Sequence, residues 1–188
     1  VTLGLVFGMI HGCLGQVFFV LLGSIAVLSA PAWVRLKASM GAQARLLVPW
    51  LVAGTAAVFL QLVLGAAMRH QHAGLAIPDF PTAYGQWWPA TDSESLLGYN
   101  QRRTHESVVT AFQIHLQMIH RLGAVLCFSL IWAAAIQTVR RLGRGALLSR
   151  WTMVWAGLVL MQFSLGMLTI WTNKAADVAT LHVAGGAL

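Results

Sequence analysis

Residues 46–68 read LLVPWLVAGTAAVFLQLVLGAAM, a stretch without a charged side chain. An α-helix rises 1.5 Å per residue, so about 20 such residues cross the ~30 Å hydrocarbon core of a bilayer. Ile119–Thr138 and Trp151–Trp171 have similar length and are also predominantly apolar. Val1–Ala30 is long enough for one further span, and Val178–Leu188 begins another. The sequence predicts four complete spans and the start of a fifth, and both chain ends are expected to be truncated.

The composition supports a membrane protein. Hydrophobic residues make up 58% of the 188 residues and charged residues only 9%, whereas soluble domains carry about 25% charged residues. So little polar surface cannot cover a water-soluble globule. The spans are continuously apolar rather than alternating, which excludes a transmembrane barrel. We therefore predict an all-α, polytopic transmembrane helix bundle.

The net charge of +7 is concentrated in two short connections. The basic residues of these connections are Arg35, Lys37 and Arg45 in the first, and Arg140, Arg141, Arg144 and Arg150 in the second. The five remaining basic residues are balanced by five acidic ones. Basic connections lie on the cytoplasmic side of membranes, so both are expected there and the segment 69–114 outside. No basic stripe remains for a nucleic acid.

The chain contains a weak internal repeat. Residues 10–15 (IHGCLG), 119–123 (IHRLG) and 181–185 (LHVAG) each place a histidine three or four residues before a glycine. The spans between them carry QLVLG at 61–65 and QFSLG at 162–166. The order His, Gln, His, Gln, His along alternating helices indicates a duplicated helical bundle.

The repeated histidines suggest a haem site. His120 and His182 are expected at similar depth on two helices that run in the same direction, and two imidazoles can occupy both axial positions of a haem iron. The nearby glycines would let a flat macrocycle approach the backbone. A packing or proton-relay role remains the alternative. Zinc or copper fits less well because three or four ligands would have to converge.

Other polar side chains near the spans have weaker interpretations. Arg69 and Arg121 are expected near the outer surface, where they could pair with haem propionates; snorkelling at a helix end is the alternative for Arg69. Gln61 and Gln162 are expected to hydrogen-bond between helices. The remaining histidines show no metal-binding spacing; they are His70, His72, His105 and His115.

The outer segment holds the most specific string, RHQHAGLAIPDFP at residues 69–81, followed by Tyr84-Gly85 and Pro89. Together with the Gln-x-x-Leu-Gly segments and the ordered histidines, this string resembles the haem A synthase family. That family has eight helices in two four-helix halves. The resemblance covers nearly the whole chain and corresponds to the fourth through eighth helices.

The resemblance implies roles for particular residues. His120 and His182 match the ligands of haem b, and His11 matches a histidine of the amino-terminal half, where the substrate haem O binds. The partner of His11 and the catalytic acid would lie upstream of Val1, so no catalytic residue is assigned here and this piece alone is expected to be inactive. The implied reaction oxidises the C8 methyl of haem O to a formyl group, which makes haem A for terminal oxidases.

The resemblance also implies a domain division, partners and a location. Residues 1–30 would be the last helix of the amino-terminal half, 31–46 a cytoplasmic loop, and 47–188 the carboxy-terminal haem-binding bundle, its last helix truncated. Haem O synthase and an electron donor or acceptor are possible partners besides the lipid. The location would be a bacterial plasma membrane or a mitochondrial inner membrane.

Two other functions remain open at this stage. A membrane cytochrome b that only transfers electrons would also use paired histidines, but it has no evident need of the Pro-Asp-Phe-Pro segment. A haem transporter or chaperone would hold haem more weakly and leave it unchanged.

Overall fold

The computed structural model describes residues 2–31, 33, 41–103 and 108–186. Over these residues, four helices are long and apolar enough to cross a membrane. They are α1 (Thr2–Ser29), α4 (Val48–His70), α6 (Ala111–Leu142) and α7 (Leu147–Trp171). The described residues form no strand, only an isolated bridge between Ala83 and Gln86. The prediction of an all-helical, multi-pass membrane protein is confirmed.

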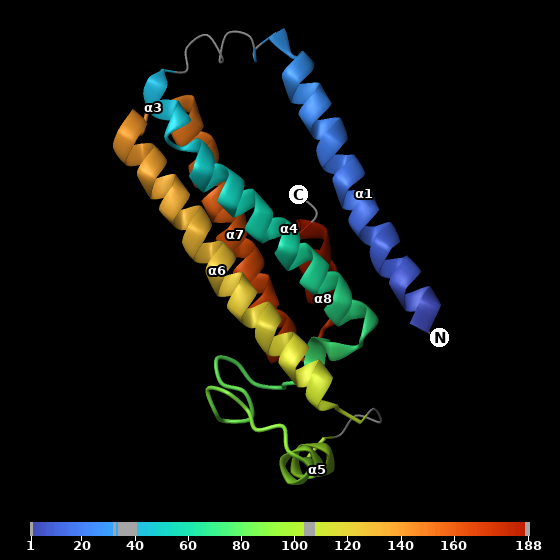
Figure 1. Ribbon diagram of the computed structural model, residues 1–188. Coiled ribbons are helices and arrows are strands. Elements are labelled where there is room, and N and C mark those ends of the chain that lie inside the picture. The colour runs from blue at the N-terminus through green and yellow to red at the C-terminus, as the bar shows by residue number, and fades with distance from the viewer. Residues whose placement is uncertain (1, 32, 34–40, 104–107, 187–188) are drawn as a thin grey trace.

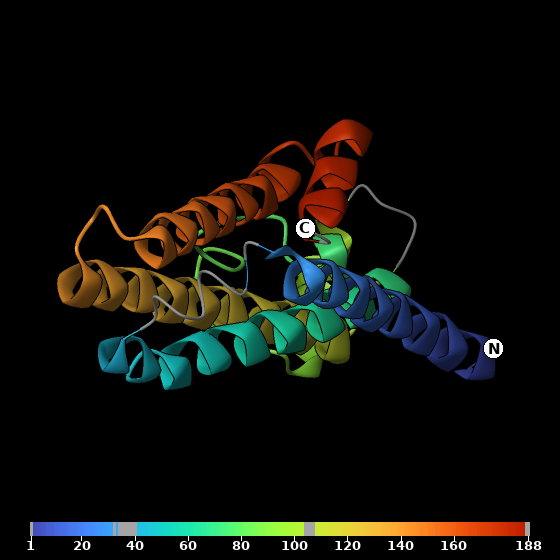
Figure 2. The ribbon, with the colours of Figure 1, turned by 90° about the horizontal axis from the view of Figure 1, so that it is seen from above.

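The packing of the helices follows their order in the chain. α4 packs against α6, α6 against α7, and α7 against the shorter α8 (Ala176–Gly186). α1 contacts α4 and leans away from the others (Figures 1 and 2). The long outer segment lies at one end of the bundle, and α3 (Ala42–Arg45) and the α6–α7 connection lie at the other (Figure 1). The basic residues Arg35 and Lys37 fall outside the described residues.

Several boundaries differ from the predicted ones. α6 begins at Ala111 rather than Ile119 because Thr110 and Gln113 form a capping box that fixes the start of the helix. The apolar run alone does not show this start, since the first turns of α6 are only partly apolar. The outer segment also contains a short 3-10 helix, η1 (Ala73–Leu75), and α5 (Ser93–Gln101). Asp92 caps α5, its carboxylate accepting from the Ser95 N–H at 3.0 Å.

The bundle has a small core toward the end opposite the outer segment. Ile131, Ala135 and Ala156 are fully buried there, and Trp155 packs against them. Gly54 on α4 makes room for Trp155, because a Cβ at this glycine would lie 2.8 Å from the indole. Most other large apolar side chains of the long helices are exposed on the helix surfaces, as expected where lipid rather than water surrounds a protein.

Candidate functional site

A glutamine on α4 contacts the first predicted ligand on α6. The Gln61 Nε2 atom lies 3.1 Å from His120 Nδ1 and donates to the His120 backbone carbonyl at 2.8 Å. Gly123 allows this approach, because a Cβ there would lie 2.3 Å from Gln61 Oε1, whereas a Cβ on Gly65 would make an ordinary contact with the imidazole at 3.5 Å. We call Gln61, Gly65, His120 and Gly123 the first Gln–His unit.

The same arrangement recurs one helix pair later. On α7, Gln162 donates through its Nε2 to the backbone carbonyl of His182 on α8. A Cβ on Gly185 would lie 2.8 Å from Gln162 Oε1, and one on Gly166 would lie 3.2 Å from the His182 ring. We call Gln162, Gly166, His182 and Gly185 the second Gln–His unit. The repeated sequence motif thus makes the same glutamine-to-backbone contact in both helix pairs.

The two units place His120 and His182 on α6 and α8, which both pack against α7. Both side chains are half-buried. Three of the glycines accommodate side chains of the neighbouring helix: Gly166 the His182 imidazole, and Gly123 and Gly185 the glutamines. The expected approach of a macrocycle to these glycines stays a prediction.

Arg121 binds the outer segment instead of standing free next to His120. Its guanidinium donates to the backbone carbonyls of Thr82 at 2.8 Å and Asp79 at 2.6 Å. The guanidinium carbon also lies 5.5 Å from the centre of the Phe80 ring, a cation–π contact. The Arg121 Nε atom is buried without a partner among the described residues. Two of the three nitrogens of the fork therefore hold the Pro-Asp-Phe-Pro segment against α6.

Phe80 also joins this segment to α7. Its ring meets Phe163 and Trp171 edge to face, with centroid distances of 6.4 Å and 6.3 Å. The Trp171 indole donates to the Phe80 carbonyl at 3.2 Å. Phe163 directly follows Gln162 of the second Gln–His unit. The outer segment thus covers the end of the bundle close to both units.

Within the segment, the Asp79 carboxylate organises a tight turn. It accepts from the Thr82 hydroxyl at 2.7 Å, from the Tyr84 N–H at 2.6 Å and from the Gly85 N–H at 2.9 Å. Partial burial is the largest single influence on the pKa of Asp79 and raises it, but the hydrogen bonds from Gly85, Thr82 and Tyr84 together outweigh burial and leave the pKa below its ordinary value. The carboxylate is thus committed to the turn and is not a free acid.

Two glutamines of α6, which the sequence did not lead us to expect at the site, bind the backbone of the outer segment. Gln117 is 2% exposed; its Oε1 accepts from the Ile77 N–H at 2.6 Å and its Nε2 donates to the Gly74 carbonyl at 3.2 Å. Gln113 donates to the Gln71 carbonyl at 2.8 Å. Their spacing of four residues places both on one face of α6, which is the signal that could have identified them.

The other predicted residues lie apart from the Gln–His units. Arg69 is exposed at the end of α4, and His11 is exposed on α1. The His70 ring packs against Gly8 of α1. His115 faces Thr91 at 3.3 Å, and His105 is outside the described residues. Across the described part of the chain, no three His, Cys, Asp or Glu side chains group as a metal site.

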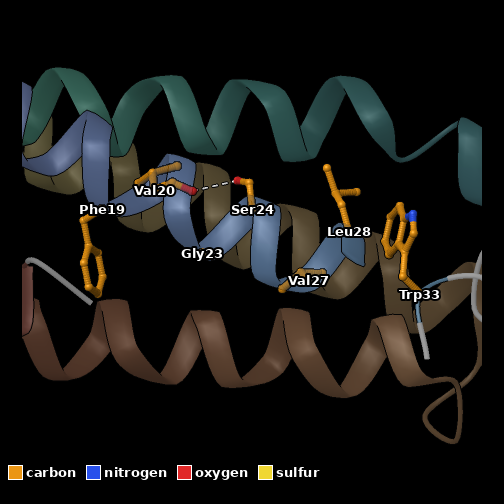
Figure 3. A pocket seen from close by; sticks show the side chains of 7 residues that line it. All are labelled: Phe19, Val20, Gly23, Ser24, Val27, Leu28 and Trp33. Atoms are coloured by element: carbon orange, nitrogen blue, oxygen red, sulfur yellow. Dashed lines mark hydrogen bonds between the residues drawn. The ribbon is translucent and has the colours of Figure 1, made fainter. Parts of the chain in front are cut away.

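An open apolar groove runs along the second half of α1, from Phe19 to Trp33 (Figure 3). The one hydrogen bond drawn there joins the Ser24 hydroxyl to the Val20 carbonyl within the helix, at 2.7 Å. The lining includes no histidine and no charged side chain. This groove offers no group that would ligate a metal or pair with a carboxylate.

Comparison with known proteins agrees with the motifs. The sequence profile of a family described as cytochrome oxidase assembly protein (COX15-CtaA) matches residues 9–188. The chain belongs to this family. The chain is also 33% identical to Heme A synthase of Caulobacter sp. (strain K31) over 141 residues, 74% of this chain and 38% of that protein.

Two Bacillus proteins match over a shorter length and at lower identity. Heme A synthase of Bacillus cereus (strain AH187) is 27% identical over 124 residues, which are 66% of this chain and 34% of that protein. Heme A synthase of Bacillus anthracis (strain A0248) is 28% identical over 124 residues, which again are 66% of this chain and 34% of that protein. The chain thus spans little more than a third of these relatives. No solved structure matches.

Proposed function

We propose that this chain is the haem-binding part of a haem A synthase, which oxidises the C8 methyl of haem O to a formyl group. Family membership and the names of the relatives support the proposal. The observation that carries it is the pair of equivalent Gln–His units, which place two half-buried imidazoles on helices that both pack against α7. Paired imidazoles are a common axial ligand set for haem iron.

The residues present fit a haem. The buried Nδ1 of His182 and the Oε1 atoms of Gln61 and Gln162 have no partner among the described residues, so this polar cluster is incomplete in the protein alone. His120 and His182 would hold haem b through imidazole nitrogens. The redox chemistry belongs to the haem, and the chain would orient the ligands and keep lipid and water from them.

The proposal assigns supporting roles to three further residues. Arg69 is exposed at the outer end of α4 and could pair with a propionate. Arg121 could contribute its Nε–H, which has no partner among the described residues, while its two terminal nitrogens each bind a backbone carbonyl. His11 would face the substrate haem O. Haem O synthase and an electron donor or acceptor are proposed as partners.

The protein would work in a bacterial plasma membrane or a mitochondrial inner membrane. Its four apolar helices make it a multi-pass membrane protein, and the relatives named above are bacterial. Of these two membranes, we propose the bacterial plasma membrane.

The ligand assignment is tested by spectra of the haem b-loaded protein. We expect a low-spin, bis-histidine spectrum that is lost in His120→Ala and in His182→Ala. His115→Ala is the matched control, because His115 lies on the same helix as His120 but contacts Thr91 in the outer segment. Retention of the spectrum in both ligand variants would show that the assignment is wrong.

The reaction itself is tested with a protein that contains this chain and spans the full length of the relatives named above. Incubation with haem O, followed by mass analysis, should yield a product with a formyl group. A bis-histidine spectrum without any product under all redox conditions would instead indicate a membrane cytochrome b. Weak, readily exchanged haem without this spectrum would indicate a transporter or chaperone.

A further inference from the structure

We propose that the arginines at the end of the bundle opposite the outer segment bind the phosphate groups of anionic phospholipids through their guanidinium forks. The described arginines of this end are all exposed; they are Arg45, Arg140, Arg141, Arg144 and Arg150. We call them the arginine rim. The proposal concerns the lipid around the protein and is independent of the haem site.

The rim brings together two parts of the chain that are far apart in the sequence. Arg45 belongs to α3, which contacts α6. The other four arginines belong to the end of α6, the start of α7 and the connection between these helices. Both parts lie at the same end of the bundle (Figure 1). The backbone at Arg45 is held in place because Ala44 and Leu47 are buried.

The connection between α6 and α7 is held by buried polar side chains. The Ser149 hydroxyl donates to the Thr138 carbonyl at 3.4 Å, and both residues are buried. Gly143 ends α6 with a φ of 79°, a conformation that favours glycine. The arginines around this turn are therefore carried by a hairpin of defined shape. Groups that are already positioned lose less conformational freedom when they bind a ligand.

No carboxylate neutralises the rim within the described part of the chain. The described acidic residues are Asp79, Asp92 and Glu94 in the outer segment and Asp177 in the first turn of α8. α8 follows the end of α7 at which Trp171 binds the outer segment. The five rim arginines also have no hydrogen-bond partner among the described residues. A partner of the rim must therefore bring the negative charge.

The surface next to the rim favours a lipid as this partner. Ile136 lies one helical turn before Arg140, and its side chain is exposed. Val154 lies one turn after Arg150 and is also exposed. Residues four positions apart share a face of a helix, so each helix presents an apolar side chain directly next to an arginine. Trp151 is exposed beside them, as is typical of membrane interfaces. A phospholipid, with apolar chains below a phosphate, matches this surface better than an acidic protein does.

The type of basic residue adds a further argument. A positive charge that only orients a protein in the membrane can be a lysine or an arginine. The described basic residues of this end are arginines throughout. A guanidinium presents its donors in a planar fork that can bind two oxygens of one phosphate, whereas an ammonium acts as a point charge. The rim thus has the chemistry of phosphate binding in addition to its charge.

Lipid binding tests the proposal, measured by native mass spectrometry in detergent on a protein that contains this chain and spans the full length of its relatives. The probes are dioleoyl phosphatidylglycerol, which is anionic, and dioleoyl phosphatidylcholine, which has no net charge. The anionic lipid should bind more tightly, and Arg144→Gln should weaken its binding about fivefold. Arg144→Lys should be intermediate, because lysine keeps the charge but not the fork.

Arg102→Gln is the matched control. It removes the same charge from an exposed arginine at the end of α5, in the outer segment. Binding of phosphatidylglycerol should stay as tight in this variant as in the unmodified protein. Equal weakening in Arg102→Gln and Arg144→Gln would overturn the proposal, because the effect would then follow net charge and not the rim.

The other outcomes are equally decisive. Equal binding of the two lipids would overturn the proposal and would favour an acidic protein segment as the partner of the rim. Displacement of the lipid by inorganic phosphate at the same concentration would overturn it in favour of a site for free anions. Loss of a basic residue can change the orientation of helices in a membrane. Should Arg144→Gln fail to fold, Arg144→Lys decides: weakened binding supports the proposal, and unchanged binding contradicts it.

Discussion

Arg121 on α6 and Phe80 in the outer segment form a cation–π contact, with the guanidinium carbon 5.5 Å from the ring centre. The same guanidinium donates to the carbonyls on either side of this ring, at Asp79 and Thr82. The arginine next to a predicted haem ligand therefore has a structural partner within the chain.

Replacing Arg121 should release the outer segment. Arg121→Gln removes two charge-assisted hydrogen bonds and the cation–π contact. We expect the free energy that holds the outer segment against α6 to fall by about 2–4 kcal/mol. Limited proteolysis should then cleave the chain faster between residues 78 and 89. Arg121→Lys should be intermediate, because lysine keeps the charge but not the fork. The control is Arg69→Gln, at an exposed helix end; equal cleavage in both glutamine variants would contradict the prediction.

Gln117→Leu should also loosen the segment. Leucine is similar in size but leaves the buried Ile77 N–H, now bound at 2.6 Å, without an acceptor. An unsatisfied buried donor costs about 1–3 kcal/mol. Amide hydrogen exchange at Ile77 is the direct measurement, and it should become faster. Gln101→Leu, at an exposed position of α5, serves as the control. In this variant the Ile77 amide should exchange as slowly as in the unmodified protein.

The turn at Asp79 should depend on pH. Its folded pKa lies below the ordinary value of 3.8, so the ionised carboxylate stabilises the turn at pH above 3.8, and this contribution is lost as the pH falls through the folded pKa. Solvent screening keeps the contribution small, below about 1 kcal/mol. Proteolysis by an acid-active protease should therefore accelerate on acidification in the unmodified protein. In Asp79→Asn, proteolysis should be faster than in the unmodified protein and should depend less on pH. Proteolysis rates that change with pH in the same way in both proteins would count against the role of the charge.

Close helix packing at Gly54 can be tested with a single methyl group. A Cβ there would lie 2.8 Å from the Trp155 ring and 3.3 Å from Ile131, and overpacking of this kind costs about 1–3 kcal/mol. Gly54→Ala should lower the thermal unfolding temperature in detergent. Gly157→Ala on α7, where nothing lies within 4 Å of the added Cβ, should not. A similar unfolding temperature in the two variants would refute the packing at Gly54.

The sequence predicted the spans well because hydropathy and length are properties of the chain itself. It also indicated that glutamines and histidines alternate along the helices, and the structure shows that Gln61 and Gln162 each bind the residue that follows in this order, His120 and His182. Contacts between segments far apart could not be predicted. The binding of Arg121 to carbonyls 39 and 42 residues away depends on how the outer segment folds back.

Some local features were visible in the sequence but overlooked. Thr110 followed by Gln113 is a capping box, and Asp92 before Ser93 and Glu94 is a helix start. Both signals would have placed α6 and α5 more accurately than the apolar run did. The role of Gly166 was not visible, since a glycine in a sequence does not reveal which side chain will approach it.

The attachment of Phe80 to both Arg121 and Trp171 has a mechanical consequence. It ties α6 to the outer end of α7, and the short connection between Leu142 and Leu147 joins the same two helices at their other ends. When a bilayer of different thickness forces helices to tilt, α6 and α7 would therefore tilt as one pair. His120 and Gln162, which lie on these two helices, would then keep their spacing in membranes of different thickness.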